Sequence, residues 1–113
     1  MKLTELDPDF IKINDFIHDQ NFKIVKDVKE ADGIMFYCPV CLANQQKGAD
    51  IHVHSIICWQ PKVPSNIHPN PGRWNLVGTS FEDLSLINGS SSVYLQGGCK
   101  AHFFITNGEI KIC

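Results

Sequence analysis

The sequence predicts an α+β fold that is mainly β, in which one N-terminal helix precedes a small antiparallel β domain. Apolar residues recur at helical spacing only in residues 8–20, near the start of the chain. From residue 33 onward, short apolar or alternating runs are separated by turn residues, which indicates strands. With 113 residues, we expect a single domain, with the helix and an edge strand in residues 1–32 and a β-rich core in 33–113.

The expected helix is defined by Phe10, Ile13 and Ile17, which would share one helical face. Asp7 and Pro8 are residue types typical of a helix start. Residues 22–28 alternate only weakly and are therefore predicted as an edge strand. The remaining expected strands are 34–37, 50–58, 73–78, 84–87, 93–96, 102–106 and 109–112.

Two segments between these strands have clear turn or loop chemistry. Asn107-Gly108 is a typical two-residue hairpin turn and should join the last two strands. Residues 60–72 hold four of the six prolines, too many for a helix or a central strand. We therefore expect a long loop there, with Trp59 and Trp74 at its two ends.

The composition limits which kinds of partner the chain could bind and in which cellular compartment it is expected. The formal net charge is -2 and the ten Lys and Arg residues are scattered, so a nucleic-acid partner is not expected. No run approaches the ~18 apolar residues that cross a membrane. The first ten residues are polar and acidic, unlike a signal peptide, so we expect a cytoplasmic protein. Five cysteines in a reducing compartment indicate metal binding or free thiols rather than disulfides.

Two short motifs predict a zinc site held by Cys38, Cys41, Cys99 and His102. Cys38-Pro-Val-Cys41 and Cys99-Lys-Ala-His102 each place two ligands across a tight turn, or knuckle, and two such halves complete a tetrahedron. Three thiolates and an imidazole favour zinc over magnesium or calcium. Four protein ligands fill the coordination sphere, which is typical of a structural zinc ion. The long gap between the pairs is tolerable, since loop closure costs only about 0.6 kcal/mol per doubling of length.

Other readings of the thiols stay open at this point. The cysteines could be buried and metal-free, or Cys38 and Cys41 could form a redox dithiol. Redox pairs of this spacing usually open a helix, whereas residues 43–48 are expected to be a loop. Cys113 could replace one of the four ligands, because the final hairpin should bring it near Cys99 and His102.

Two further features could carry function. His52 and His54 would share one strand face and could bind a second metal ion, although a half-exposed strand face is the simpler interpretation. Trp59 and Trp74 could pack the base of the proline-rich loop or present an aromatic surface to a partner.

The motifs together resemble a family of small uncharacterised phage and prophage proteins. The resemblance covers about residues 34–113, and its most specific part is the pattern Gly-Gly-Cys-x-x-His-Phe-Phe-Ile-x-x-Gly-x-Ile at residues 97–110. It implies a compact zinc-ribbon-like domain with two knuckles, whose metal ligands would be Cys38, Cys41, Cys99 and His102. Leu42 stands where some members have glycine, so the first knuckle is expected to be less regular.

We therefore expect a phage-type zinc-binding structural or interaction module without catalytic activity of its own. It would dock on a protein partner in a phage particle or in the cytoplasm of the infected host cell. The alternative is a zinc-dependent hydrolase or nuclease that uses His52 and His54, and a second alternative is a nucleic-acid-binding zinc ribbon. The sequence leaves the partner and the oligomeric state open.

Overall fold

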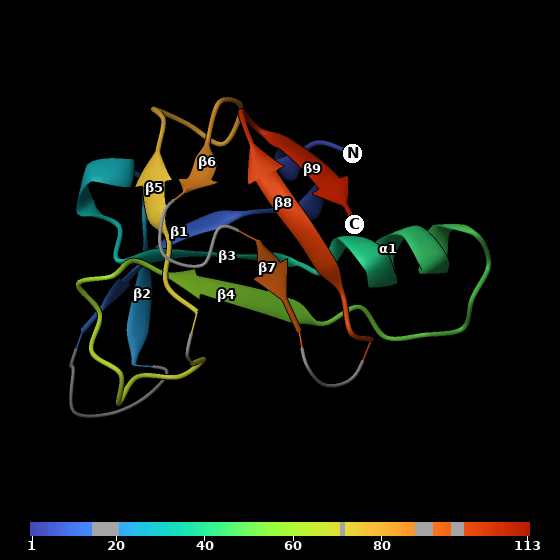
Figure 1. The fold of residues 1–113 in the computed structure, drawn as a ribbon, viewed down its shortest axis with the longest axis horizontal. Helices are drawn as coiled ribbons and strands as arrows, with labels where there is room; N and C mark the ends of the chain where they lie inside the picture. Colours follow the sequence, from blue (N-terminus) through green and yellow to red (C-terminus); the bar gives the residue numbers. More distant parts are fainter. Residues whose placement is uncertain (15–20, 71, 88–91, 96–98) are drawn as a thin grey trace.

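The computed structural model describes residues 1–14, 21–70, 72–87, 92–95 and 99–113, and these form three antiparallel sheets and one α-helix (Figure 1). The chain therefore has the α+β, mainly β fold that the sequence predicts. Two short 3₁₀ helices, η1 (Leu3–Leu6) and η2 (Val28–Glu30), complete the regular structure of the described residues.

The largest sheet has four strands in the order β2-β1-β3-β4. Its strands are β1 (Asp9–Ile13), β2 (Phe22–Val25), β3 (Gly33–Tyr37) and β4 (Ser55–Trp59). Side chains alternate between its faces, and both faces are covered. One face carries Phe10, Ile34, Phe36, Ile56 and Cys58 into the main core, and the other carries Ile11, Ile13 and Trp59 into a second cluster under the proline-rich loop.

The second half of the chain forms a hairpin and a three-stranded sheet. The hairpin pairs β5 (Asn75–Val77) with β6 (Ser85–Ile87). The sheet has the order β7 (Val93–Tyr94), β8 (His102–Thr106) and β9 (Glu109–Ile112). Strand β8 packs across the four-stranded sheet, where the rings of Phe36 and Phe103 meet edge-on with centroids 6.0 Å apart.

The predicted turn at Asn107-Gly108 is confirmed. Both residues have positive φ angles, 49° and 76°, as a two-residue hairpin turn of this type requires. The turn also contacts the β5–β6 hairpin, because the Gly108 amide donates to the Leu84 carbonyl at 2.8 Å. A Cβ atom at Gly108 would collide with the backbone of Glu82, so this position needs glycine for space as well as for its φ angle.

The start of the chain lies along the last strand. The Leu3 amide donates to the Gly108 carbonyl at 2.9 Å, and the Ile110 amide donates to the Met1 carbonyl at 2.8 Å. Leu3 and Leu6 are fully buried in the main core. The two ends of the described chain therefore lie side by side (Figure 1).

The predicted N-terminal helix is wrong. Residues 9–13 form β1, which pairs with both β2 and β3, and the rest of the expected helix at 15–20 lies outside the described residues. Phe10 and Ile13 fall on opposite faces of β1, and each is buried because the sheet is covered on both sides. An apolar residue on each face produced a spacing that imitates a helix.

The helix lies instead where a loop was expected. α1 (Pro39–Gln46) follows β3 directly and projects from one end of the sheets (Figure 1). The edge-strand prediction for 22–28 is confirmed only for its first part, since β2 lies at the edge of its sheet but ends at Val25, and η2 begins at Val28. The expected strand 50–58 begins only at Ser55. The predicted strands 102–106 and 109–112 are observed with those bounds, 34–37 begins one residue earlier, and the other three are shorter than predicted.

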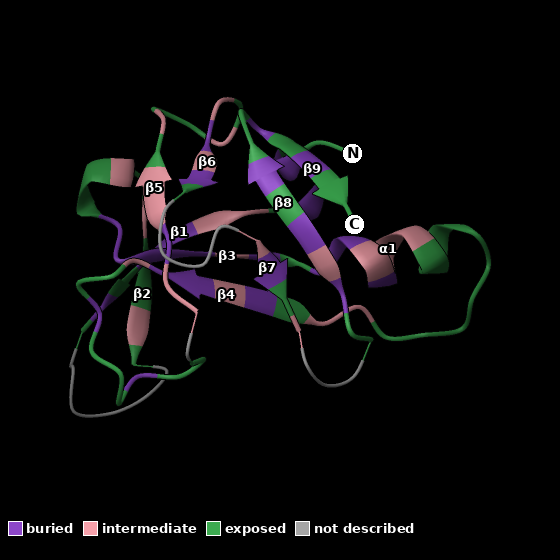
Figure 2. Cartoon of the chain, viewed as in Figure 1, coloured by how far each residue is buried: buried purple, intermediate pink, exposed green. Residues whose placement is uncertain are grey.

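The aromatic surface that Trp59 and Trp74 were expected to present to a partner is not exposed. Their exposed fractions are 1% and 7%, and both belong to buried clusters. Most of β4, which ends at Trp59, is coloured as buried in Figure 2. The Trp74 amide donates to the Trp59 carbonyl at 3.0 Å, and the Trp59 indole N–H donates to the His68 carbonyl at 2.9 Å. The two side chains therefore pack the base of the loop, which was the other interpretation of the sequence.

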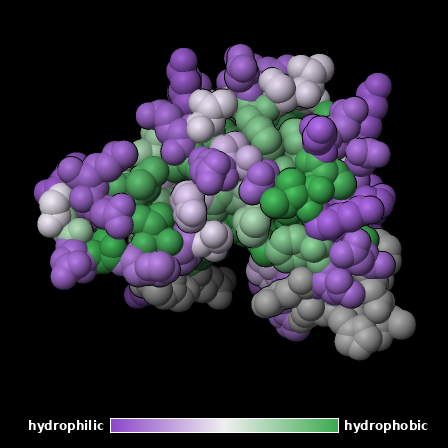
Figure 3. Space-filling view, turned by 180° about the vertical axis from the view of Figure 1, so that it is seen from behind, coloured by the Kyte–Doolittle hydropathy of each residue, from purple (hydrophilic) through white to green (hydrophobic). Residues whose placement is uncertain are grey.

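The outer surface has no single apolar face in the view from behind. Hydrophobic side chains gather there in separate patches among hydrophilic ones, over the α1 end and over the opposite half of the molecule (Figure 3). Among the described residues, no helix has the length and apolar character needed to cross a membrane.

Candidate metal centre

Cys38 and Cys41 are positioned by the junction of β3 and α1. Cys38 follows the last residue of β3 and is the N-cap of α1, and Cys41 lies in the first turn of the helix. Pro39 at the first helical position has a fixed φ angle suited to a helix start and lacks an N–H that would be left unpaired there. The motif is therefore a strand-to-helix junction that turns both sulfur atoms to the same side.

His54 and Cys99 come from two other segments. The Cys38 amide donates to the His54 carbonyl at 2.9 Å, which extends the pairing of β3 and β4 by one residue. Cys99 lies just before β8, and Lys100 after it has a left-handed φ angle of 53°. The Leu95 amide donates to the Ala101 carbonyl at 2.8 Å and fixes this approach to β8.

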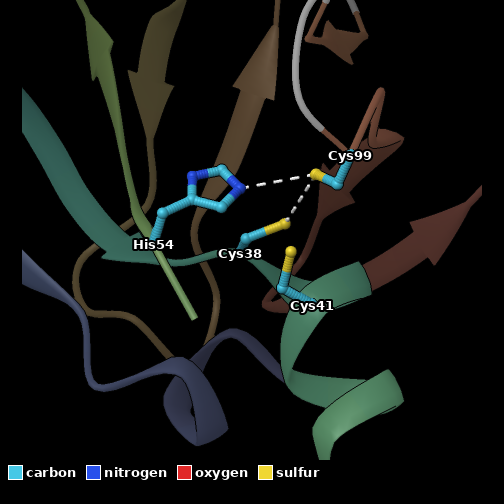
Figure 4. Close-up of side chains that lie close together, drawn as sticks. All are labelled: Cys38, Cys41, His54 and Cys99. Carbon is cyan, nitrogen blue, oxygen red and sulfur yellow. Dashed lines mark hydrogen bonds between the residues drawn. The ribbon is translucent and has the colours of Figure 1, made fainter. Parts of the chain in front are cut away.

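These four side chains converge on one point (Figure 4). Their ligand atoms all lie within 4.8 Å of one another. The Sγ atoms of Cys38 and Cys99 are 3.6 Å apart, and His54 Nε2 lies 3.4 Å from Cys99 Sγ. Cys38 and Cys41 are buried, His54 is half-buried and Cys99 is exposed, so the group lies at the edge of the main core.

In the absence of a metal ion, the surroundings of the buried Cys38 and Cys41 thiols disfavour their ionisation. Burial raises the pKa of Cys38, and burial together with the neighbouring thiols raises the pKa of Cys41 to about 12. At Cys99 burial also acts upward, but hydrogen bonds from His54 and from the Ala101 backbone outweigh it and lower the pKa to about 7. Three sulfurs at this spacing cannot all be anionic at neutral pH unless a positive charge lies among them.

The donor set is suited to a metal ion. Three thiolates and one imidazole are the ligands of Cys₃His zinc sites, and soft sulfur ligands discriminate against magnesium and calcium. A divalent cation would also remove the cost of ionising buried thiols, because a thiol that coordinates a metal is deprotonated. The group Cys38, Cys41, His54 and Cys99 could therefore hold one metal ion.

The structure differs from the sequence prediction at the fourth ligand, because His54 and not His102 lies beside the three thiols. His102 is the first residue of β8, and its neighbour Phe103 is fully buried in the core. Alternation along the strand turns the His102 ring to the other face, where Nε2 lies 3.1 Å from Ser92 Oγ and the ring lies 4.9 Å from that of Tyr94.

A signal for His54 was present in the sequence. The alternation in residues 50–58 places His54 on the same face as Ile56 and Cys58, and that is the face that enters the main core with Cys38 and Cys41. The short spacing of Cys99 and His102 is the more common ligand pattern, so the sequence favours His102. Spacing alone does not reveal that residues 99–102 run into a strand instead of closing a knuckle.

Two other predicted ligands lie elsewhere. Cys113 is exposed and outside the group, and its amide donates to the His102 carbonyl at 2.9 Å. His52 is exposed, and because β4 begins only at Ser55, it does not share a strand face with His54. In the part of the chain that the structure describes, no second cluster of metal ligands occurs.

One argument against a redox dithiol fails, since Cys38-Pro-Val-Cys41 does open a helix. Other observations replace it. A reactive cysteine at a helix start normally has a lowered pKa, whereas burial raises that of Cys38. A third thiol and an imidazole also lie at the same point, and a two-cysteine redox centre does not require them.

No protein-family model, no curated protein and no solved structure matches this chain. The site is therefore interpreted from its own geometry, and the likeness to phage zinc-ribbon-like proteins stays a prediction.

Proposed function

We propose that this chain is a zinc-binding structural module, whose ion is held by Cys38, Cys41, His54 and Cys99. The observation that carries the proposal is the convergence of three sulfurs and one imidazole nitrogen within 4.8 Å. Four protein ligands leave no position for a water nucleophile, which separates structural from catalytic zinc. A hydrolase that uses His52 and His54 loses its support, because these residues do not share a site.

The role of the ion would be to join segments that are far apart in the sequence. Cys38 and Cys41 belong to the junction of β3 and α1, His54 precedes β4, and Cys99 precedes β8. Among the residues that the structure describes, the four-stranded and three-stranded sheets share no backbone ladder. Zinc would therefore connect them at the end of the molecule that carries α1, while the core connects them elsewhere.

Cysteine variants test this function. Cys38→Ser and Cys99→Ser should each lose the ion and most of the stability, because binding energy at a structural zinc site is also folding energy. Cys58→Ser is the matched control: Cys58 is fully buried but outside the site, so its loss should cost on the order of 1 kcal/mol and leave zinc in place. The measurements are zinc content by elemental analysis and thermal unfolding. Equal damage from all three variants would contradict the ligand assignment.

We further propose that the module docks on an extended segment of a protein partner, in a hollow between β4 and β7. This cavity of about 300 Å³ is lined by residues 54–57 and 92–95, together with parts of the proline-rich loop and Trp74. Three consecutive residues of β4 and both residues of β7 line it, so the cavity faces strand edges and not only side chains. Strands β4 and β7 are each the edge of their sheet.

Backbone direction supports an extended ligand. The Trp59 carbonyl accepts from Trp74 and so points away from β3. Backbone groups two residues apart point the same way, so those of Ile57 and Ser55 also point away from β3. Within the described residues they have no backbone partner on that side. Unpaired edge groups beside a partly apolar cavity are suited to strand addition by a peptide.

A library of random unstructured peptides, selected against the zinc-loaded chain, tests this docking site. Tyr94 lines the hollow and is 54% exposed, so Tyr94→Ala should weaken the selected peptides about tenfold or more. Ile24→Ala is the control, since Ile24 is 63% exposed on β2 at the opposite edge of its sheet. Peptides that bind all three proteins equally, or no selectable peptide, would contradict the docking proposal.

A further inference from the structure

Cys99 differs from the other two thiols in its access to solvent. Cys38 is fully buried and Cys41 is 6% exposed, whereas Cys99 is exposed. A small oxidant that diffuses to the site therefore meets the Cys99 sulfur first. Sulfur bound to zinc is present as a thiolate, which is the nucleophilic form.

The buried sulfur of Cys38 is placed to complete a reaction begun at Cys99. The two Sγ atoms are 3.6 Å apart, and a disulfide bond would need to shorten this by about 1.5 Å. The Cys41 sulfur also lies within 4.8 Å of both, but the direct contact of 3.6 Å joins Cys38 and Cys99. The residues are 61 positions apart in the chain, so their proximity is a property of the fold.

We propose that Cys99 is a peroxide-reactive residue and that its oxidation yields a Cys38–Cys99 disulfide with release of the zinc ion. The inference rests on the proposed function, because it assigns a modification to the same site. The three site thiols could form three different disulfides. The inference predicts only the Cys38–Cys99 bond, because Cys99 is exposed and Cys38 lies in contact with it.

The reaction balances with hydrogen peroxide as the oxidant. The Cys99 thiolate attacks one peroxide oxygen, the O–O bond breaks and hydroxide leaves, which gives a sulfenic acid on Cys99. The Cys38 thiolate then attacks this sulfur, the S–O bond breaks and a second hydroxide leaves. The two sulfurs lose two electrons in total and the peroxide gains them. Only Cys41 and His54 remain as ligands, so the ion dissociates.

The product would keep the fold closed without metal. A Cys38–Cys99 bond connects the same two segments that zinc connects, the junction of β3 with α1 and the approach to β8. A Cys38–Cys41 bond would close only a local loop and leave the three-stranded sheet without its link. The identity of the disulfide therefore decides whether the zinc-free oxidised chain keeps a covalent link between these two segments.

The test uses the zinc-loaded full chain with Cys113→Ser, which removes the exposed thiol outside the site and prevents linkage between chains. Stepwise addition of hydrogen peroxide should release about one zinc ion per peroxide consumed, followed with a chromogenic chelator. Peptide mapping should then find Cys99 joined to Cys38, and circular dichroism should show the fold retained. Thiol reductant plus zinc should restore the starting state.

Other outcomes overturn the inference: zinc retained in excess peroxide, a Cys38–Cys41 bond, or zinc release with unfolding. A chain that carries no zinc at all contradicts the proposed function instead. In that case mapping of the oxidised metal-free chain still tests the inference, since a Cys38–Cys99 bond supports the predicted pair and any other pair or none overturns it.

Discussion

Among single residues, His54 and His102 show most clearly that the site is not built from two knuckles. His54 lies beside the three thiols, and His102 does not. His54 Nε2 lies 3.4 Å from Cys99 Sγ, and the His54 carbonyl is fixed by the Cys38 amide. His102 instead contacts Ser92 and Tyr94 on the outer face of β8. The two residues are both half-buried histidines, so they form a natural pair of test and control.

We expect His54→Ala to weaken zinc binding by a hundredfold or more, since even outer-shell changes cost about 10–100-fold in metal affinity. His102→Ala should leave the affinity within a few-fold of the wild type. Competition with a chelator of known affinity measures both. If His102→Ala loses zinc and His54→Ala retains it, the fourth ligand is the one that the sequence pattern indicated.

The thiol pKa values predict how zinc binding depends on pH. In the metal-free chain the pKa values of Cys38 and Cys41 are raised, so both are protonated at neutral pH and must lose protons when zinc binds. Affinity should therefore rise about 100-fold per pH unit above pH 7. Below pH 7, where Cys99 with a pKa of about 7 is also protonated, the slope should approach about a thousandfold. A chelator competition series from pH 6 to 8 measures it, and an affinity independent of pH would mean that the thiols are not ligands.

Three of the four converging residues could be predicted from the sequence, and the fourth could not be chosen with certainty. Cys38, Cys41 and Cys99 are the cysteines with short ligand spacing, and they come together. His54 reaches the site only through the pairing of β3 with β4, which is a contact between distant segments. Local spacing carries no information on such pairing, so two histidines remained possible in principle.

At the scale of elements, the side chain of Arg73 holds the proline-rich loop in shape. The Arg73 guanidinium donates to five backbone carbonyls, those of Val63, Pro64, Ile67, Pro69 and Gly72, at 2.8–3.1 Å. A planar fork with five N–H donors can satisfy such a set, and an ammonium group cannot. The loop therefore holds its shape around one side chain, which the proline content alone does not reveal.

Arg73→Lys should lower the free energy of unfolding by about 2 kcal/mol, because hydrogen bonds from a charged donor are worth roughly 1.5–3 kcal/mol each but part of this group stays solvated. It should also make residues 60–70 more sensitive to limited proteolysis. Lys12→Gln, an exposed cation on β1, is the control and should change neither property. Unchanged cleavage in Arg73→Lys would show that the prolines alone fix the loop.

The sequence predicts an element correctly where turn residues mark its end. It predicts an element poorly where a strand is buried on both faces. The final hairpin has the predicted bounds, since Asn107-Gly108 specifies both its turn and its register. β1 was mistaken for a helix because both its faces are buried. The sequence does not indicate α1, because Asn44, Gln45 and Gln46 provide no apolar stripe and the helix start depends on Pro39.

In the whole molecule, the main core and the proposed ion would hold the sheets together at different places. Phe36 and Phe103 pack in the middle, and the start of the chain pairs with β9 at one end. The proposed ion would link the two sheets at the end of the molecule near α1. Removal of the ion should therefore destabilise the segments near α1 more than the strands that pack in the core, because the core contacts persist.

Chelation should increase hydrogen exchange most in β7 and β8, by tenfold or more, since Cys99 leads directly into β8. Amides of β1 and β3, which lie inside the four-stranded sheet, should keep more of their protection. Exchange measured by mass spectrometry with and without chelator resolves these segments. A uniform increase over all strands would instead indicate that zinc supports the fold as one cooperative unit.

The central claim is that one zinc ion is bound by three sulfurs and one nitrogen. X-ray absorption spectroscopy at the zinc edge, combined with elemental analysis, tests it most directly. The account predicts one zinc per chain, three sulfur neighbours at about 2.3 Å and one imidazole nitrogen at about 2.0 Å, with the nitrogen signal lost in His54→Ala and kept in His102→Ala. A folded chain without zinc, or zinc surrounded mainly by oxygen, would contradict it.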